Sequence, residues 1–383
     1  MKMLTAFTYE LDDVELAVAE IKEQLNLKQN LRKNAVGILS CYAEFVDTGV
    51  VDALCRALPF EVVGSTTLGN ATNGGCGMLM LSLTVLTDDH LRFATTHTAS
   101  LLENPQQAMD EAYHAAVARL PGRPSLILAY FPFIQDMGGE LLLECLRRAT
   151  GEVPIYGTVA CDHNLDYREA YTLNNGEGFR SSLSMALIYG SISPTFLVAS
   201  IPKEGIQKQA AVITASCGNL VKTVNNLPVE QYLLTLGLSA GNGFAGISAI
   251  PFVLDYSSGT RPAARVIYML NGEGEAVCGG EMPEGATLAI SSLDHDNVIH
   301  TAQQMTETIL KVGAQSGALL FSCLSRNMAL KTRMEAELSI FMQRLAGVPF
   351  AVSYSGGECC PIQEEGGGLV NRIHNFTLTA CIF

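Results

Sequence analysis

The fold is decided by a pattern that occurs three times, and its first strand reads AVGILSC at 35–41, LILAYF at 126–131 and ALLFSC at 318–323. Each copy continues with a helix-like segment and a second strand that ends in small polar residues: EVVGSTT at 61–67, PIYGTVA at 154–160 and FAVSYSGGE at 350–358. Gly64 and Gly157 are 93 residues apart, and Gly356 follows 199 residues later, or about two repeat lengths. Such spacing indicates an internally repeated architecture.

Strands that alternate apolar residues with Ser and Thr follow the glycine turns, as in GMLMLSLTVLT at 77–87 and FTLTACIF at 376–383. A period of two is typical of half-buried antiparallel strands, whereas helical spacing recurs after Asp296, a plausible N-cap, and after Cys323. We therefore predict a mixed α/β (α+β) fold with two lobes, in which repeated strand–helix–strand units form large mixed sheets with outer helices. The predicted domains are 1–225, with two units of about 93 residues, and 226–383.

Composition narrows the class of protein. The chain has 383 residues, 48% of them hydrophobic, and a net charge of −14. A chain this apolar can bury a large core, and its negative charge repels nucleic acid, since no run of basic residues offsets it. The uncharged stretch 181–202 contains serines and Pro194, and reads as two strands rather than a membrane helix. Without a signal peptide or a CxxC pair, we expect a cytoplasmic protein with reduced cysteines and no membrane partner.

Two short motifs occur in an unsuitable context. GxSxG at 237–241 would need a strand before its serine and a helix after it, and the order here is reversed. GxGxxG at 241–246 precedes an apparent strand with a proline, whereas a dinucleotide site needs a helix there. Both strings are better interpreted as a glycine-rich connection.

The glycine turns are the better candidates for a binding site. Glycine at the end of a buried strand leaves backbone N–H groups and space for a ligand, although it also simply permits a tight turn. These two interpretations carry equal weight. The candidate residues in these turns are Gly64, Ser65, Thr66, Gly157, Thr158, Asp162, Gly357 and Glu358.

The order of the segments resembles the FIST-domain sensory proteins. The N-terminal half of that family is matched by VVGSTTLG at 62–69, IYGTVACD at 155–162, LNNGEG at 173–178 and the stretch 212–233. The C-terminal half is matched by FSCLSR at 321–326, YSGGE at 354–358 and HNFTLT at 374–379, which add Arg326 and Asn375 to the ligand-binding candidates. One departure is Asn225-Asn226 before Pro228, where the family often has Asp-Gly. The resemblance divides the chain into a FIST N-terminal domain (1–225) and a FIST C-terminal domain (226–383).

The resemblance implies a bacterial or archaeal cytosolic sensor of a small molecule, such as an amino acid, that signals through a separate partner such as a histidine kinase. Stand-alone members include haem-binding nitric-oxide sensors of the NosP type. In that case haem b would be bound non-covalently, with His374 or His163 as the axial ligand and Cys323 or Cys161 as lesser candidates. Self-association into a homo-oligomer is compatible with this class. The alternative is an enzyme at the glycine turns, using Asp162, Glu358 and Arg326 as acid, base and anion clamp.

Overall fold

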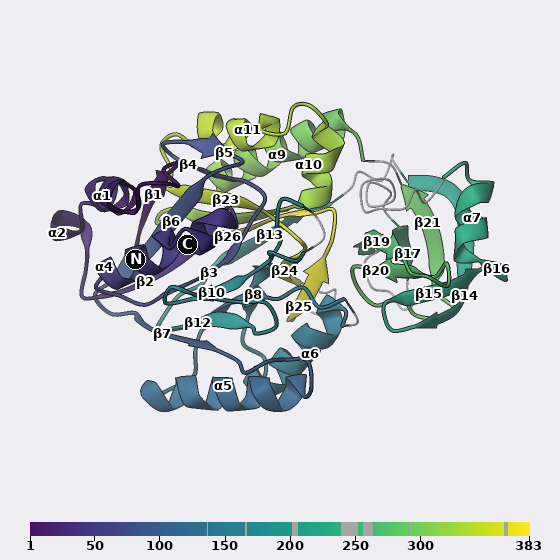
Figure 1. Cartoon of the computed structure of the whole chain (residues 1–383), viewed down its shortest axis with the longest axis horizontal. Helices are drawn as coiled ribbons and strands as arrows, with labels where there is room; N and C mark the ends of the chain where they lie inside the picture. Colours follow the sequence, from purple (N-terminus) through teal and green to yellow (C-terminus); the bar gives the residue numbers. More distant parts are fainter. Residues whose placement is uncertain are drawn as a thin grey trace.

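Three six-stranded sheets, each built around one parallel strand pair, make up the larger part of the molecule (Figure 1). The computed structural model describes residues 1–135, 137–164, 167–200, 206–238, 252–255, 263–291, 293–363 and 367–383. The GxSxG and GxGxxG strings lie, from residue 239 onward, outside the described residues. The mixed α/β fold with repeated units is confirmed.

Each parallel pair consists of the two strands that the repeat predicts. The pairs are β2 (Asn34–Cys41) with β3 (Val62–Thr66), β8 (Leu126–Phe131) with β9 (Ile155–Val159), and β22 (Ala318–Cys323) with β23 (Phe350–Ser355). The first strand of each pair also binds an antiparallel strand, which is β6 (Leu81–Asp88), β12 (Ser184–Tyr189) or β26 (Leu378–Ile382). Beyond these lie β1 (Lys2–Thr8), β7 (Arg92–His97) and β13 (Thr195–Ala199). Consequently β12 and β13 account for the uncharged stretch predicted to be two strands.

The three units exchange hairpins in a cycle. The hairpin β4 (Asn70–Thr72)–β5 (Cys76–Gly77) follows β3 but pairs with β23. Likewise β10 (Thr172–Asn174)–β11 (Glu177–Phe179) follows β9 and pairs with β3, and β24 (Glu358–Gln363)–β25 (Leu369–His374) follows β23 and pairs with β9. Each sheet is therefore completed by a neighbouring unit, and no unit forms its sheet alone.

Helices cover the outer faces of the sheets (Figure 1). The first unit carries α1 (Val14–Leu25), α2 (Leu27–Asn30), α3 (Glu44–Asp47) and α4 (Val50–Ala57), the second α5 (Pro105–Arg119) and α6 (Gly139–Thr150), and the third α9 (His295–Val312), α10 (Leu324–Leu330) and α11 (Ala336–Arg344). Asp294 rather than Asp296 caps α9, because its side chain accepts the backbone N–H of Asn297. None of the helices in the described part of the chain is long and apolar enough to cross a bilayer.

A small lobe is inserted between β13 and α9 of the third unit. It contains β14 (Ile206–Cys217), β15 (Leu220–Val224), β16 (Leu227–Pro228), α7 (Val229–Thr235), β17 (Phe252–Asp255), β18 (Ala263–Arg265), β19 (Ile267–Leu270), β20 (Ala276–Cys278) and β21 (Thr287–Ser291). These strands form a sheet with its own core, drawn at the right in Figure 1. This insertion, and not a further repeat, explains the double spacing between Gly157 and Gly356.

The residue 225/226 boundary expected from sequence falls inside this lobe, in the turn between β15 and β16. Asn225 and Asn226 both adopt positive φ, 52° and 62°, as a two-residue turn of this kind requires. Asparagine tolerates that conformation better than most residues, so this turn forms without a glycine.

Candidate functional site

The ends of the three second strands meet in the structure. The backbone N–H of Cys161 donates to the carbonyl of Thr66 (3.2 Å), that of Tyr354 to Gly69 (2.9 Å), and that of Gly356 to Val159 (2.9 Å). The glycine turns of all three units therefore touch one another, although they are far apart in the sequence.

Gly64 and Gly157 lie within the strands, where strand packing requires them. A Cβ atom at Gly64 would lie 1.8 Å from the carbonyl oxygen of Leu39, and one at Gly157 would lie 1.7 Å from that of Ala129. The strand register places Ser353, not Gly356, at the corresponding position of the third unit. The close approach of two backbones accounts for both glycines.

Most polar groups of the turns bind the chain itself. Thr66 Oγ1 accepts the N–H of Tyr171 (2.8 Å), Thr158 Oγ1 donates to the carbonyl of Gly357 (3.1 Å), and Asp162 Oδ2 accepts the N–H of Glu169 (2.9 Å). The hydroxyl of buried Ser65 has no partner among the described residues. Thr66, Thr158 and Asp162 thus hold the strand crossings together, and neither these side chains nor Ser65 lines the open pocket described below.

Glu358 is fully buried at the start of β24. Its carboxyl group accepts the hydroxyls of Ser355 (2.9 Å) and Thr377 (2.6 Å). Burial raises the pKa of Glu358 to about 8, against the opposing effects of those hydrogen bonds and of Arg326. The carboxyl is therefore largely protonated at neutral pH, a state that suits a hydrogen-bonded core group.

Arg326 lies beneath α9 and α11 in an equally buried position. Its Nη2 is 2.6 Å from Glu337 Oε1 and 2.8 Å from Thr301 Oγ1, and Ser322 donates to the other oxygen of Glu337 (2.9 Å). The ion pair neutralises the charge of the guanidinium inside the core. The structure thus separates Arg326 from the pocket.

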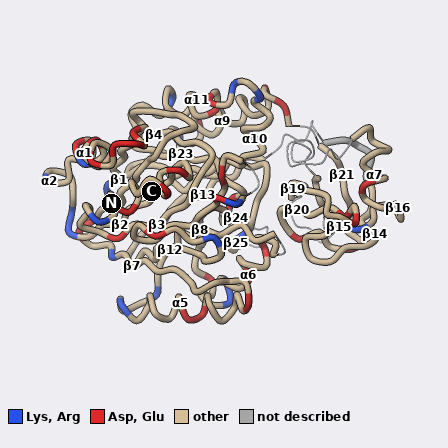
Figure 2. The backbone as a smooth tube through the Cα atoms, viewed as in Figure 1, with Lys and Arg blue, Asp and Glu red and all other residues tan. Residues whose placement is uncertain are grey.

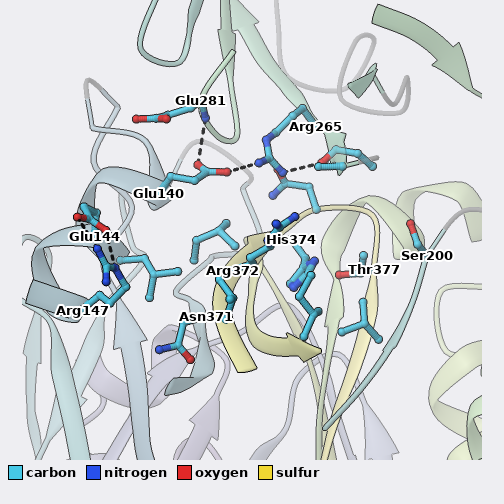
Figure 3. A pocket seen from close by; sticks show the side chains of 18 residues that line it. Glu140, Glu144, Arg147, Ser200, Arg265, Glu281, Asn371, Arg372, His374 and Thr377 are labelled. Carbon is cyan, nitrogen blue, oxygen red and sulfur yellow. Dashed lines mark hydrogen bonds and ion pairs between the residues drawn. The ribbon is translucent and has the colours of Figure 1, made fainter. Parts of the chain in front are cut away.

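An open pocket of about 620 Å³ lies beside the meeting point of the turns, between α6, the β24–β25 hairpin and the small lobe (Figure 3). Of the residues predicted from sequence, His374 and Asn375 line it. Thr377 lines it as well, and its hydroxyl is the one that donates to buried Glu358. One edge of the pocket therefore lies against the point where the three turns meet.

Asn375 is the unusual residue of this pocket. Its side chain is 1% exposed, yet neither Oδ1 nor Nδ2 has a hydrogen-bond partner among the described residues. Gly279 of the small lobe and Gly357 flank the amide, since Cβ atoms there would lie 2.6 Å from Oδ1 and 3.0 Å from Nδ2. A buried amide without partners costs about 1–3 kcal/mol for each unsatisfied group. The amide thus carries a donor and an acceptor that no described group satisfies.

Charged side chains of both signs surround the pocket (Figure 3). Arg265 of the small lobe pairs with Glu140 of α6, whose other oxygen accepts the N–H of Glu281 (3.1 Å). Burial raises the pKa of Glu140, and the charge of Arg265 opposes that shift. On the rim, Arg147 pairs with Glu144 (2.7 Å), and Arg372 of β25 also lines the pocket.

Sequence reasoning missed these charged residues. Arg372 stands two positions before His374 and could have been found with it, but the pair of Glu140 with Arg265 carries no local signal. The two residues come from a helix of the second unit and a strand of the small lobe, and only the docking of the lobe brings them together.

The two candidate histidines occupy different places. His374 lines the pocket, and its Nε2 lies 3.0 Å from the carbonyl of Cys360, so Nε2 carries the proton. Loss of hydration, with smaller effects from Arg265 and Arg372, lowers the pKa of His374 to about 4. His163 packs its ring 4.7 Å from that of Tyr42 and does not line the pocket. Only His374 offers a neutral imidazole to a molecule there.

No cluster of three or more His, Cys, Asp and Glu side chains suited to a metal ion occurs in the described segments. Comparison with known proteins matches most of the chain to two domain families. A family model described as the FIST N domain matches residues 35–227, and one described as the FIST C domain matches residues 222–361. The two stretches meet inside the small lobe, at β15 and β16. No curated protein matches the sequence.

Proposed function

Since the chain belongs to the FIST family, whose domains are associated with sensory signalling and small-ligand binding, we propose that it is a sensor whose ligand binds in the 620 Å³ pocket. The unpartnered amide of Asn375 is the observation that carries this proposal. A pocket of this size is suited to a metabolite, and buried polar groups without partners are normally satisfied by a ligand or by water.

The lining favours a small polar ligand with a carboxylate. Arg147, Arg265 and Arg372 offer guanidinium groups, while Glu140, Glu144 and Glu281 balance their charge. An amino acid carries a carboxylate and an ammonium group, so it would give both the arginines and the glutamates an oppositely charged partner. Asn375 would fix its orientation, because one amide can donate and accept at the same time.

The test is thermal unfolding of the full chain with each of the twenty standard amino acids and a set of dicarboxylates. A ligand present at 100 times its Kd should stabilise the folded state by about 2.7 kcal/mol. Asn375→Ala should weaken binding by about tenfold to a hundredfold, the range expected for lost buried hydrogen bonds. Asn297→Ala, on α9 and away from the pocket, is the matched control. The proposal is rejected if no compound stabilises the protein, or if both variants bind equally well.

Haem is the second ligand we propose for this pocket, because His374 fits an axial ligand. Its ring is neutral, and the hydrogen bond of Nε2–H to the carbonyl of Cys360 leaves the lone pair on Nδ1. Arg147 and Arg372 line the same pocket and are the cations that would approach the propionates. Bound haem b would supply an iron that takes up nitric oxide. Cys323 suits this role poorly, since burial raises the pKa of its thiol to about 12.

A Soret band in protein purified from haem-supplemented cells tests this second candidate. His374→Ala should abolish the band and His163→Ala should leave it. A colourless protein, or a band that survives His374→Ala, would exclude His374-bound haem.

We further propose that the signal passes to a separate protein such as a histidine kinase. The expected result is that the ligand-bound and ligand-free forms differ in their effect on autophosphorylation of the kinase.

A further inference from the structure

A second pocket, of about 390 Å³, lies where the parallel strands β2 and β3 begin, at the other end of this strand pair from the meeting point of the turns. The connection from α2 to β2, the loop before β3, the strand β7 and the end of α5 form its walls. We call it the basic groove, and its distinguishing residues are Arg32, Lys33, Phe60, Arg92, Phe93 and Arg119. It shares no residue with the proposed sensory pocket.

The charge of the basic groove is opposite to that of the protein. The chain has a net charge of −14, yet this pocket contains four cationic side chains and one carboxylate, that of Glu61. No basic run in the sequence predicts it, because the cations come from three separate segments. In Figure 2, basic stretches lie between α2 and β2 and at one end of α5, on the same side of the molecule.

The single carboxylate of the groove is already neutralised. Glu61 Oε1 pairs with Arg119 Nη2 (2.5 Å), and Glu61 Oε2 accepts the N–H (3.2 Å) and hydroxyl (2.9 Å) of Thr95. Outside the lining, Asp88 lies 3.7 Å from Arg32. The backbone N–H of Lys33 donates to Asp89 Oδ1 (3.2 Å), whereas the Lys33 ammonium has no ion-pair or hydrogen-bond partner in the described part of the chain. An excess of positive charge therefore remains.

Two of the guanidinium groups are held in place by backbone carbonyls. Arg119 Nη1 donates to the carbonyl of Thr95 (2.9 Å), and Arg92 Nη2 donates to that of Pro121 (2.9 Å). The Arg92 guanidinium also lies 5.7 Å from the ring centre of Tyr189. Fixed guanidinium groups lose less conformational entropy on binding an anion than free side chains do.

We propose that the basic groove binds a phosphorylated small molecule of about mononucleotide size. Phosphate oxygens would meet Arg32, Lys33 and Arg92, since arginine and lysine are the residues that recognise phosphate. The half-buried rings of Phe60 and Phe93 offer a planar group a surface for stacking. The volume lies within the range of small-ligand pockets and is too small for a folded partner segment.

Calorimetric titration of the full chain with ADP, pyrophosphate and adenosine tests this proposal. We expect ADP to bind more tightly than pyrophosphate, adenosine not to bind, and added salt to weaken binding. The double variant Arg32→Gln/Lys33→Gln should raise the Kd for ADP by at least about tenfold, as expected for lost charged hydrogen bonds. Lys22→Gln/Lys28→Gln changes the net charge equally on α1 and α2, and should leave the Kd unchanged.

Several outcomes would overturn the proposal. One is that neither ADP nor pyrophosphate binds. Another is that the two double variants weaken ADP binding equally. A third is that an oligo-glutamate peptide binds more tightly than ADP and displaces it. If the groove variant does not fold, Lys33→Gln alone keeps the test, because this exposed side chain has no contact to lose. Thermal unfolding of each variant without ligand verifies that the fold is intact.

Discussion

We expect the stability of the protein to fall between pH 6.5 and 8, and Glu358→Gln to remove most of that fall. The pKa of Glu358 is about 8 in the folded state, compared with an ordinary value of 4.5. The folded protein keeps a proton that the unfolded chain releases. The contribution of this group to stability is therefore fully present below pH 4.5 and is lost as the pH rises to 8.

The size of the effect follows from the same shift. A difference of about 3.5 pKa units corresponds to about 5 kcal/mol over the whole range, and to about 2 kcal/mol between pH 6.5 and 8. His374 acts in the opposite direction, because its pKa is lowered from 6.5 to about 4. Its effect is to increase the free energy of unfolding as the pH rises from 4 to about 6.5. The change in stability between pH 6.5 and 8 therefore comes mainly from Glu358.

Urea unfolding followed by circular dichroism at four pH values from 6.5 to 8 measures this slope. Glutamine keeps the shape of the side chain. Its amide oxygen can accept a hydrogen bond from one hydroxyl and its NH₂ group can donate to the other, so Ser355 and Thr377 both retain a partner. Glu23→Gln, an exposed residue of α1, is the control and should retain the wild-type slope. A Glu358→Gln slope equal to that of the wild type would refute the reasoning.

Three further substitutions probe the packing around the two sites. Gly157→Ala should cost more than about 4 kcal/mol of unfolding free energy, or prevent folding, since its Cβ would lie 1.7 Å from a carbonyl oxygen. Arg326→Met should cost about 3–5 kcal/mol in urea unfolding, because it leaves the Glu337 carboxylate buried without its partner. Glu140→Gln should raise the hydrogen-exchange rate of β18 and β20, since the pair with Arg265 joins the small lobe to α6.

Each of these three substitutions has a matched control. Gly272→Ala meets no atom within 4 Å and should cost less than about 1 kcal/mol. Arg326→Met combined with Glu337→Leu should recover much of the lost stability, and a double variant as unstable as the single one would contradict the ion-pair argument. Glu144→Gln removes an exposed pair on the same helix, and equal exchange rates in Glu140→Gln and Glu144→Gln would contradict the docking role.

The repeat pattern predicted the six strands of the three parallel pairs because the signal of each strand is local. Apolar strands such as LILAYF, and glycines that recur at one spacing, identify the units without knowledge of their neighbours. The hairpin exchange could not be predicted in this way, since short strands such as Asn70–Thr72 carry little apolar periodicity and their partners lie in another unit. The sequence equally gives no sign that Gly157 serves a strand pair rather than a ligand.

The candidate site was predicted only in part for the same reason. His374 and Asn375 lie at the end of a strand that the sequence marks clearly, and both line the pocket. Glu358 and Arg326 were chosen as charged residues near the turns, but Glu358 is held largely uncharged by burial within the core, and Arg326 pairs there with Glu337. Whether a buried charge faces a ligand or another side chain depends on contacts between distant segments.

The placement of the pocket determines how a ligand could change the shape of this protein. Its walls come from α6 of the second unit, from a hairpin that the third unit contributes to the second sheet, and from the small lobe. A ligand can shift the docking of the lobe only by the difference between its affinities for the docked and released states, and a near-complete shift needs a ratio of about 10⁴. A molecule that contacts only α6 and the sheets binds the docked and released states equally well. One that also contacts Arg265 joins the small lobe to the sheets and competes with Glu140 for the same guanidinium. If the pocket is the sensory site that we propose, we therefore expect its ligand to be long enough to reach both Asn375 and Arg265.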